Sequence, residues 1–293
     1  MIVAKTEPQA SQMLMRRKRR YSVEHFFSYF VLGVFTLFTL FPLFIMIAVS
    51  LMPSSHLSSE LYRLWPNRIN MRNYLLMWTK LPVAQLLRNS VVIAGGSTLL
   101  ALLTGIPASY AMSRTKVFGR RFWLFSFLAS QLFSPSIIIV SAYHIVAFVH
   151  LTNTYWSLII LDAGFYSLPF VIWSIAGFMR HIPRELEEAI DVDGGSTWTK
   201  IRKIFVPISS PAIIVGGVYA FIQSWNDFAF ALTLATSKST MPLPIGIYSF
   251  MGAYQIQWNY LMGASIVATI PVLVLFLVVQ KRLVSGMLAG SVR

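Results

Sequence analysis

The chain contains no cysteine, so disulfide bonds, thiolate catalysis and cysteine-ligated metal sites are excluded. Charged residues are also scarce: they make up 12% of the 293 residues, and only ten are acidic. The sequence has no G-x-x-x-x-G-K-[ST] phosphate loop, so the chain is not expected to bind ATP in that way. The HExxH and GxSxG patterns of metalloproteases and serine hydrolases are missing too.

Apolar residues, in contrast, make up 56% of the chain. A soluble domain carries about 25% charged residues, roughly twice the share seen in this chain. A helix needs about 20 apolar residues to cross the hydrocarbon of a membrane. The sequence therefore predicts an all-α integral membrane protein with six transmembrane helices, at residues 26–51, 90–112, 122–148, 156–179, 208–234 and 261–279.

The distribution of basic residues predicts the orientation of these spans. Eighteen of the 24 Lys and Arg residues lie before span one, between spans two and three, between spans four and five, or after span six. By the positive-inside rule, these segments and both termini are cytoplasmic, in a multi-pass protein of a bacterial inner membrane. The net charge of +14 then reflects contact with membrane lipid, and no nucleic-acid partner is expected. The other side carries Arg63, Arg68, Arg72, Lys80, Arg88 and Lys238.

The first span follows a basic run, an order that resembles a signal peptide. The span is about twice as long as a usual apolar signal region, and further spans follow it, so a retained helix is expected. The predicted organisation is a mobile cytoplasmic tail at residues 1–25 held near anionic lipid, one six-helix domain at residues 26–282, and a short cytoplasmic tail at residues 283–293.

Half of the acidic residues lie in the longest cytoplasmic connection, residues 180–207. Pro183 suits the first turn of a helix, and the acids that follow it are stabilised by the positive end of the helix dipole. Leu186, Ala189 and Ile190 share one helical face. The pair Gly194-Gly195 allows the left-handed backbone that ends a helix.

A second short helix is expected after the glycines, capped by Ser196 or Thr197. Its apolar face would contain Trp198, Ile201 and Phe205. On residue types alone, this hairpin could rest on the membrane surface as an ordinary amphipathic element. It could equally dock into a groove of a soluble partner and transmit that partner's movement.

The order of residues in this loop resembles the EAA loop of permease subunits in binding-protein-dependent ABC importers. That family pattern is Glu-Ala-Ala, a glycine four residues later, and nine further residues to Ile-x-Leu-Pro. The present chain has "EAI" from Glu188, "DG" ending at Gly194, and "IFVP" ending at Pro207. Ile190 replaces the second alanine and Val206 the leucine; both remain apolar, so no loss of function is expected.

Further stretches resemble the carbohydrate-importer branch of the family, and specifically the smaller permease of maltose-type transporters. They cover most of the chain from about residue 25 onward. The stretches are "LRNSVVIA", "PASYAMSR", "LPFVIW", "SWNDFAFALTL" and "QKRLVSGMLAG".

The resemblance implies that this chain forms half of a translocation path for a carbohydrate and is not itself an enzyme. The implied partners are a second homologous permease in a heterodimer, two ATPase subunits that carry ATP and Mg, and an extracytoplasmic solute-binding protein. No cofactor is expected on this chain. The residues implied for coupling to the ATPase are Glu187, Glu188, Ala189, Asp193, Gly194, Ile204 and Pro207.

Acidic residues inside the spans are a second source of candidates, because such groups persist at membrane depth only beside a partner or water. Asp227 lies in the outer part of span five next to Trp225 and Asn226, and these three residues are the candidates for a substrate path. A structural role for Asp227 is the alternative. Asp162 is nearer the outer boundary, where interfacial solvation is the expected explanation.

Two other classes of membrane protein predict different patterns. An ion-coupled secondary transporter would show paired ionisable residues near the midplane and an inverted repeat, and a membrane enzyme would show a nucleophile, base or metal cluster. None of these patterns is visible. Within the importer class, five basic residues against Glu60 alone in the first outer loop favour an acidic sugar, such as an alginate-type uronate oligosaccharide.

Overall fold

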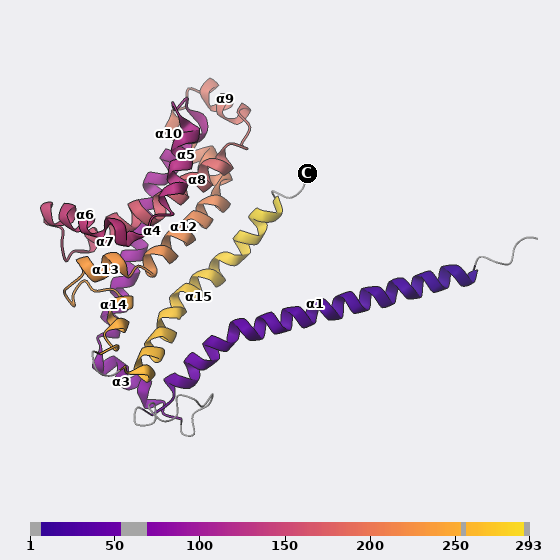
Figure 1. Cartoon of the computed structure of the whole chain (residues 1–293). Coiled ribbons are helices and arrows are strands. Elements are labelled where there is room, and N and C mark those ends of the chain that lie inside the picture. The colour runs from indigo at the N-terminus through magenta and orange to yellow at the C-terminus, as the bar shows by residue number, and fades with distance from the viewer. Residues whose placement is uncertain (1–6, 54–68, 253–255, 290–293) are drawn as a thin grey trace, which may run out of the picture.

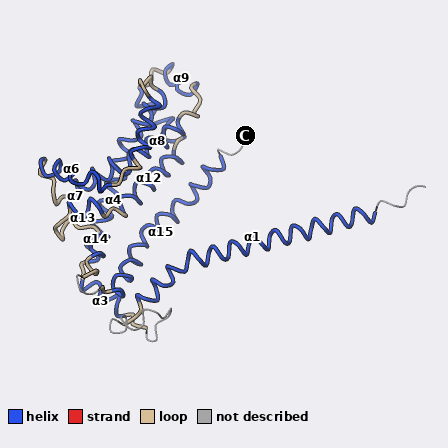
Figure 2. The backbone as a smooth tube through the Cα atoms, in the orientation of Figure 1, coloured by secondary structure: helices blue, strands red, loops and turns tan. Residues whose placement is uncertain are grey.

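The computed structural model describes residues 7–53, 69–252 and 256–289, and side chains between residues 27 and 280 of those ranges. This described part is almost entirely helical and contains no β-strand (Figure 2). Arg63 and Arg68, two of the basic residues expected on the outer side, lie outside it. The all-α prediction is confirmed.

Three helices form the centre of the molecule: α4 (Val83–Arg114), α8 (Leu168–Met179) and α12 (Ser210–Trp225), each in contact with the other two. Small residues let these helices approach closely, as is common inside membranes. A Cβ atom added to Gly105 of α4 would lie 2.6 Å from the side chain of Val171 in α8, so only glycine fits there.

The first and last long helices form a separate pair beside this centre. Helices α1 (Glu7–Ser50) and α15 (Trp258–Ala289) contact each other, and α1 then diverges from the remaining helices (Figure 1). Residues 7–25, which we expected to form a tail, continue α1 as helix. The most apolar window of the span Phe27–Ser50 has no residue buried within this chain.

Four helical segments are long and apolar enough to cross a membrane: Phe27–Ser50, Val83–Arg114, Tyr155–Met179 and Trp258–Gln280. Two further helix pairs qualify if each bent pair is counted as one span, which gives up to six. One pair is α5 (Arg120–Ser130) with α6 (Pro135–Phe148), bent by 99°; the other is Thr197–Ile208 with α12, bent by 81°.

The continuous spans predicted at residues 122–148 and 208–234 are therefore wrong in detail. The first breaks where Ser134 caps α6 and Pro135 occupies its first turn. The second ends at Trp225 and resumes as α13 (Ala229–Leu234). The fourth span is unbroken but contains a π-helical turn, η2 (Asp162–Ser167), between α7 (Tyr155–Leu161) and α8.

Short elements cover the two ends of the central helices. At one end lie α3 (Arg72–Lys80) and α14 (Leu243–Tyr248), and at the other lies α9 (Glu185–Val192) (Figure 1). The chain returns from α9 through α10 (Thr197–Lys200), the π-helical η3 (Ile201–Phe205) and α11 (Val206–Ile208). The acidic connection thus forms one end of the molecule.

Candidate functional site

The helix α9 begins at Glu185, so Pro183 precedes its first turn and does not lie in it as predicted, and it ends before the glycine pair as expected. Its first turn carries Glu185, Glu187 and Glu188, whose charges favour the positive end of the helix dipole. After the C-cap, Gly194 adopts a left-handed backbone with φ of 73°. The amide of Gly195 donates to the carbonyl of Ile190 at 2.8 Å, which satisfies a terminal carbonyl of the helix.

The return segment after the glycines is tied to both α9 and the core. Ser196 caps α10 by accepting a hydrogen bond from the amide of Thr199, and Lys200 forms an ion pair with Asp191 of α9 at 2.6 Å. Ile201 and Phe205 are buried in the main hydrophobic core. The second half of the hairpin is therefore anchored in the core.

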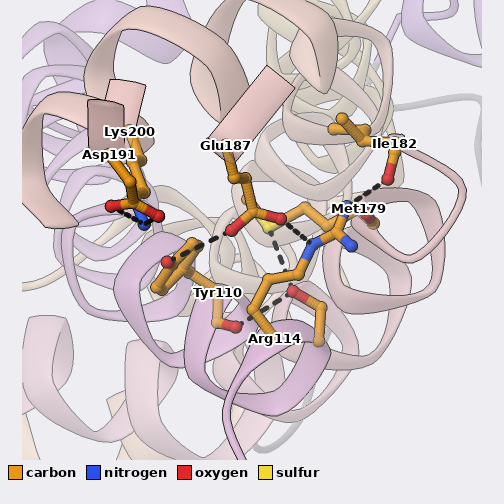
Figure 3. Close-up of polar contacts among 8 residues, drawn as sticks. Tyr110, Arg114, Met179, Ile182, Glu187, Asp191 and Lys200 are labelled. Carbon is orange, nitrogen blue, oxygen red and sulfur yellow. Dashed lines mark hydrogen bonds and ion pairs between the residues drawn. The ribbon is translucent and has the colours of Figure 1, made fainter. Parts of the chain in front are cut away.

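A buried ion pair holds α9 itself to the end of α4. The Nε atom of Arg114 lies 3.0 Å from Oε1 of Glu187, and the two side chains are only 8% and 12% exposed (Figure 3). The hydroxyl of Tyr110 donates to Oε2 of Glu187 at 3.5 Å. Removal of one partner from a buried pair typically costs about 3–5 kcal/mol, because the other charge is left uncompensated.

The same arginine also holds the end of α8 and the return segment. Its terminal nitrogen donates to the carbonyl of Met179 at 2.8 Å and to that of Ile182, so it satisfies one carbonyl at the end of α8 and one just beyond it (Figure 3). Its guanidinium lies 5.1 Å from the ring centre of Phe205, a cation–π contact. One side chain thus connects four segments: α4, α8, α9 and η3.

The opposite face of the loop is exposed and partly apolar. None of the residues of α9 is fully buried, and Val192 and Trp198 are 87% and 62% exposed. Of the apolar face predicted at Trp198, Ile201 and Phe205, the last two residues are buried and Trp198 is exposed. Large apolar side chains exposed among charges typically mark a protein-binding surface.

The predicted coupling residues fall into two groups. Glu188, Ala189, Asp193 and Gly194 are exposed, and so is Pro207 in the first turn of α11. Glu187 instead faces inward to Arg114, and Ile204 is buried in the core. Sequence reasoning missed Arg114, Tyr110, Val192 and the Asp191–Lys200 pair; the only available signal for Arg114 was its position at the cytoplasmic end of span two.

The structure does not bring the three predicted path residues into one site. Trp225 stacks on Phe221 with ring centres 5.5 Å apart, and with Asn226 it lines a cavity of about 330 Å³ beside α14 and α15. Asp227 turns elsewhere and accepts hydrogen bonds from the Tyr166 hydroxyl at 2.9 Å and the Ala231 amide at 2.9 Å. This geometry gives Asp227 a helix-capping role at α13.

Asp162 is fully buried, so the expectation of interfacial solvation is wrong. One of its carboxylate oxygens accepts a hydrogen bond from Ser224 of α12. No group of three or more His, Asp or Glu residues that could hold a metal ion occurs within the described ranges.

Comparison with known proteins gives one family and several relatives. The family model described as "Binding-protein-dependent transport system inner membrane component" matches residues 9–287. The sulfoquinovosyl glycerol transport system permease protein of Agrobacterium fabrum is 29% identical, over 85% of this chain and 87% of that protein. The trehalose transport system permease protein of Mycobacterium tuberculosis is also 29% identical, over 85% and 90%.

A similar fold occurs in a crystal structure of a bacterial ABC transporter involved in the import of the acidic polysaccharide alginate. The TM-score is 0.75 at 19% identity, covering 90% of this chain and 97% of that one. This likeness concerns the fold alone.

Proposed function

Since this chain belongs to the family of binding-protein-dependent transport system inner membrane components, we propose that it is a permease subunit that carries a carbohydrate inward across a bacterial inner membrane. Relatives named as permeases for sulfoquinovosyl glycerol and trehalose support a carbohydrate substrate. ATP and Mg would be bound by a separate ATPase, and this chain would form part of the translocation path and catalyse no reaction itself.

The observation that carries the proposal is the two-sided geometry of α9. One face is tied through Glu187 and Arg114 to α4 and α8, and the other presents Glu188 beside exposed apolar groups. A partner that moved this exposed face would move the ends of the membrane helices with it, because buried contacts join them. We propose that the partner is the ATPase and that Glu188, Ala189, Asp193 and Gly194 contact it.

The arrangement of α1 supports a second permease as a further partner. The most apolar window of its span has no residue buried within this chain, so this surface is available to lipid or to another subunit. In the proposed assembly the second permease completes the path, a solute-binding protein delivers sugar on the outer side, and both termini are cytoplasmic, as the excess of inner basic residues favours.

An acidic oligosaccharide is a narrower candidate for the substrate. Among the described outer residues, Arg72 and Arg88 have no acidic partner, whereas Lys80 is already occupied by Gln257 and by the ring of Tyr260. Free basic groups at the outer side would attract a polyanion. ATP-driven uptake of an alginate trisaccharide, compared with uptake of trehalose, tests this narrower proposal.

The coupling assignment is tested with proteoliposomes that contain this chain, its partner permease, the ATPase and the binding protein. Glu188→Ala should abolish ATP hydrolysis stimulated by sugar and binding protein while the complex stays assembled. Glu185→Ala is the matched control, since Glu185 is an exposed acid of the same helix. Full stimulation in Glu188→Ala would overturn the role of this face in coupling.

A further inference from the structure

A polar and aromatic strip crosses the middle of the membrane domain, away from the cytoplasmic loop. Its members are Gln131 at the end of α5, Phe170 and Trp173 on α8, and Tyr219 and Gln223 on α12. The Tyr219 hydroxyl donates to Oε1 of Gln131 at 3.1 Å and accepts from Nε2 of Gln223 at 2.8 Å. Phe170 lies against Tyr219 with ring centres 4.1 Å apart and against Trp173 with centres 6.1 Å apart.

Three independent counts place the strip near the bilayer midplane. At a rise of about 1.5 Å per residue, Gln131 lies about 16 Å from the cytoplasmic start of α5. The same rise places Phe170 about 14 Å from the cytoplasmic end of α8, and Tyr219 about 14 Å from the start of α12. Half of the hydrocarbon thickness is about 15 Å.

At this depth, the partial exposure of the polar side chains of the strip indicates what they face. Gln131, Tyr219 and Gln223 are half-buried, and Trp173 is 42% exposed. An amide with unused donors and acceptors is costly against lipid, so polar groups at membrane depth face protein or a water-filled cavity. Asp227 and Tyr166 differ, because they are satisfied by each other and by the end of α13.

The backbone beside the strip departs from a regular α-helix in two places. The 99° bend between α5 and α6 begins at Gln131, and the π-helical turn Asp162–Ser167 interrupts the neighbouring span. Nε2 of Gln131 donates to the carbonyl of Tyr166 in that turn at 3.2 Å, which joins the two irregularities. Broken helices and π-turns at membrane depth are typical of substrate sites.

The strip also continues to the cytoplasmic end of the domain. Trp173 forms part of a groove of about 360 Å³ that is also lined by Ser174, Gly177, Arg121 and Arg180. Within the described part of the chain, neither arginine has an acidic partner. The groove therefore places two basic side chains beside Trp173, at the cytoplasmic end of the strip.

We propose that this strip is a carbohydrate contact surface along which the sugar passes during translocation. Sugar hydroxyls would bond to Gln131, Tyr219 and Gln223, and the apolar faces of the sugar rings would stack on Phe170 and Trp173. This inference rests on the proposed function. It differs from the substrate path predicted at Trp225, Asn226 and Asp227.

Because this chain has no cysteine, each single-cysteine variant carries one thiol on this chain, and labelling is measured on this chain after the subunits are separated. In the full complex, Gln223→Cys should react with a membrane-impermeant, anionic thiosulfonate about 100-fold faster than Leu103→Cys, since hydrocarbon excludes the charged reagent. Leu103 is an exposed apolar residue of α4 at a similar depth. The sugar probe is whichever of trehalose, maltotriose and an alginate trisaccharide wild-type vesicles take up, and its presence should slow the reaction of Gln223→Cys.

Uptake by Tyr219→Phe and Gln223→Leu should fall about tenfold each, the loss expected for one contact of about 1.4 kcal/mol. Thr269→Val is the comparator, because Thr269 lines the other cavity beside Trp225, and it should keep wild-type uptake. If Gln223→Cys reacts slowly with the reagent, or if the sugar does not slow its reaction, in vesicles that transport that sugar, the strip is not a carbohydrate contact surface. The proposed function would still stand. Loss of uptake in Thr269→Val alone would place the route at the other cavity. Absence of ATP-driven sugar uptake by wild type would instead count against the proposed function.

Discussion

Arg114 and Glu187 form a buried ion pair that joins the last turn of a membrane helix to a helix of the cytoplasmic loop, with Nε and Oε1 3.0 Å apart. The next residue, Glu188, takes no part in this pair and is exposed. Two adjacent acids of one motif therefore have separable tasks. Glu187 positions the loop, and Glu188 is available to a partner.

The first prediction concerns stability. Glu187→Ala should lower the free energy of unfolding by about 3–5 kcal/mol, because the charge of Arg114 is left buried without a partner. Glu185→Ala, at an exposed position of the same helix, should change it by less than about 0.5 kcal/mol. Thermal unfolding of the detergent-solubilised complex measures both. Equal stability of the two variants would show that the ion pair does not hold the loop.

The second prediction concerns docking. Trp198→Ala should weaken association with the ATPase by about 2 kcal/mol or more, the loss typical of a central aromatic contact, without lowering stability, because the side chain is 62% exposed. Phe118→Ala is the control, since Phe118 is 98% exposed in the connection between α4 and α5. Titration of each variant with the purified ATPase measures the two affinities. If Trp198→Ala binds the ATPase as tightly as Phe118→Ala, Trp198 is not part of the interface.

Much of the fold follows from local features of the sequence. Apolar length predicts the spans, and the acids and glycines of the loop predict α9, which runs from Glu185 to Val192. Pro135 is visible in the sequence, but a proline inside a span can bend a helix slightly or break it. The 99° change of direction depends on packing of α6 against other helices, which no local pattern contains.

The site is predicted less completely than the fold, because its key contacts join distant segments. Tyr110 and Glu187 are 77 residues apart, and helical spacing cannot show which acid of α9 will meet an arginine of α4. Spacing alone groups Leu186 with Ile190. The structure separates them, with Ile190 half-buried against the core and Leu186 exposed.

The third prediction separates capping from transport at Asp227. Asp227→Ala should lower stability by about 1–2 kcal/mol, since α13 loses its cap and the Tyr166 hydroxyl loses its acceptor. Asp227→Asn keeps one carbonyl oxygen for the cap and should retain most of both stability and sugar uptake. Parallel measurement of unfolding and uptake decides the matter. If Asp227→Asn is stable but transports nothing, the carboxylate belongs to the substrate path after all.

The fourth prediction uses two glycines with the same backbone conformation. Gly194 and Gly119 have φ values of 73° and 68°, and a Cβ atom at either would meet no other atom within 4 Å. Alanine at each position should therefore lower the free energy of unfolding by a similar amount, roughly 1–2 kcal/mol, through backbone strain alone.

The functional result should nevertheless differ between these two variants. Gly194 ends the helix that is proposed to receive the movement of the ATPase, whereas Gly119 precedes α5 in a different cytoplasmic connection. A changed backbone at position 194 redirects the chain between α9 and α10 and so disturbs the exposed face that contains Glu188. ATP hydrolysis stimulated by sugar and binding protein should be lost in Gly194→Ala and kept in Gly119→Ala. Equal loss in both would mean that strain anywhere on the cytoplasmic side uncouples the transporter, and that the geometry of the α9 turn has no special part in transmitting force.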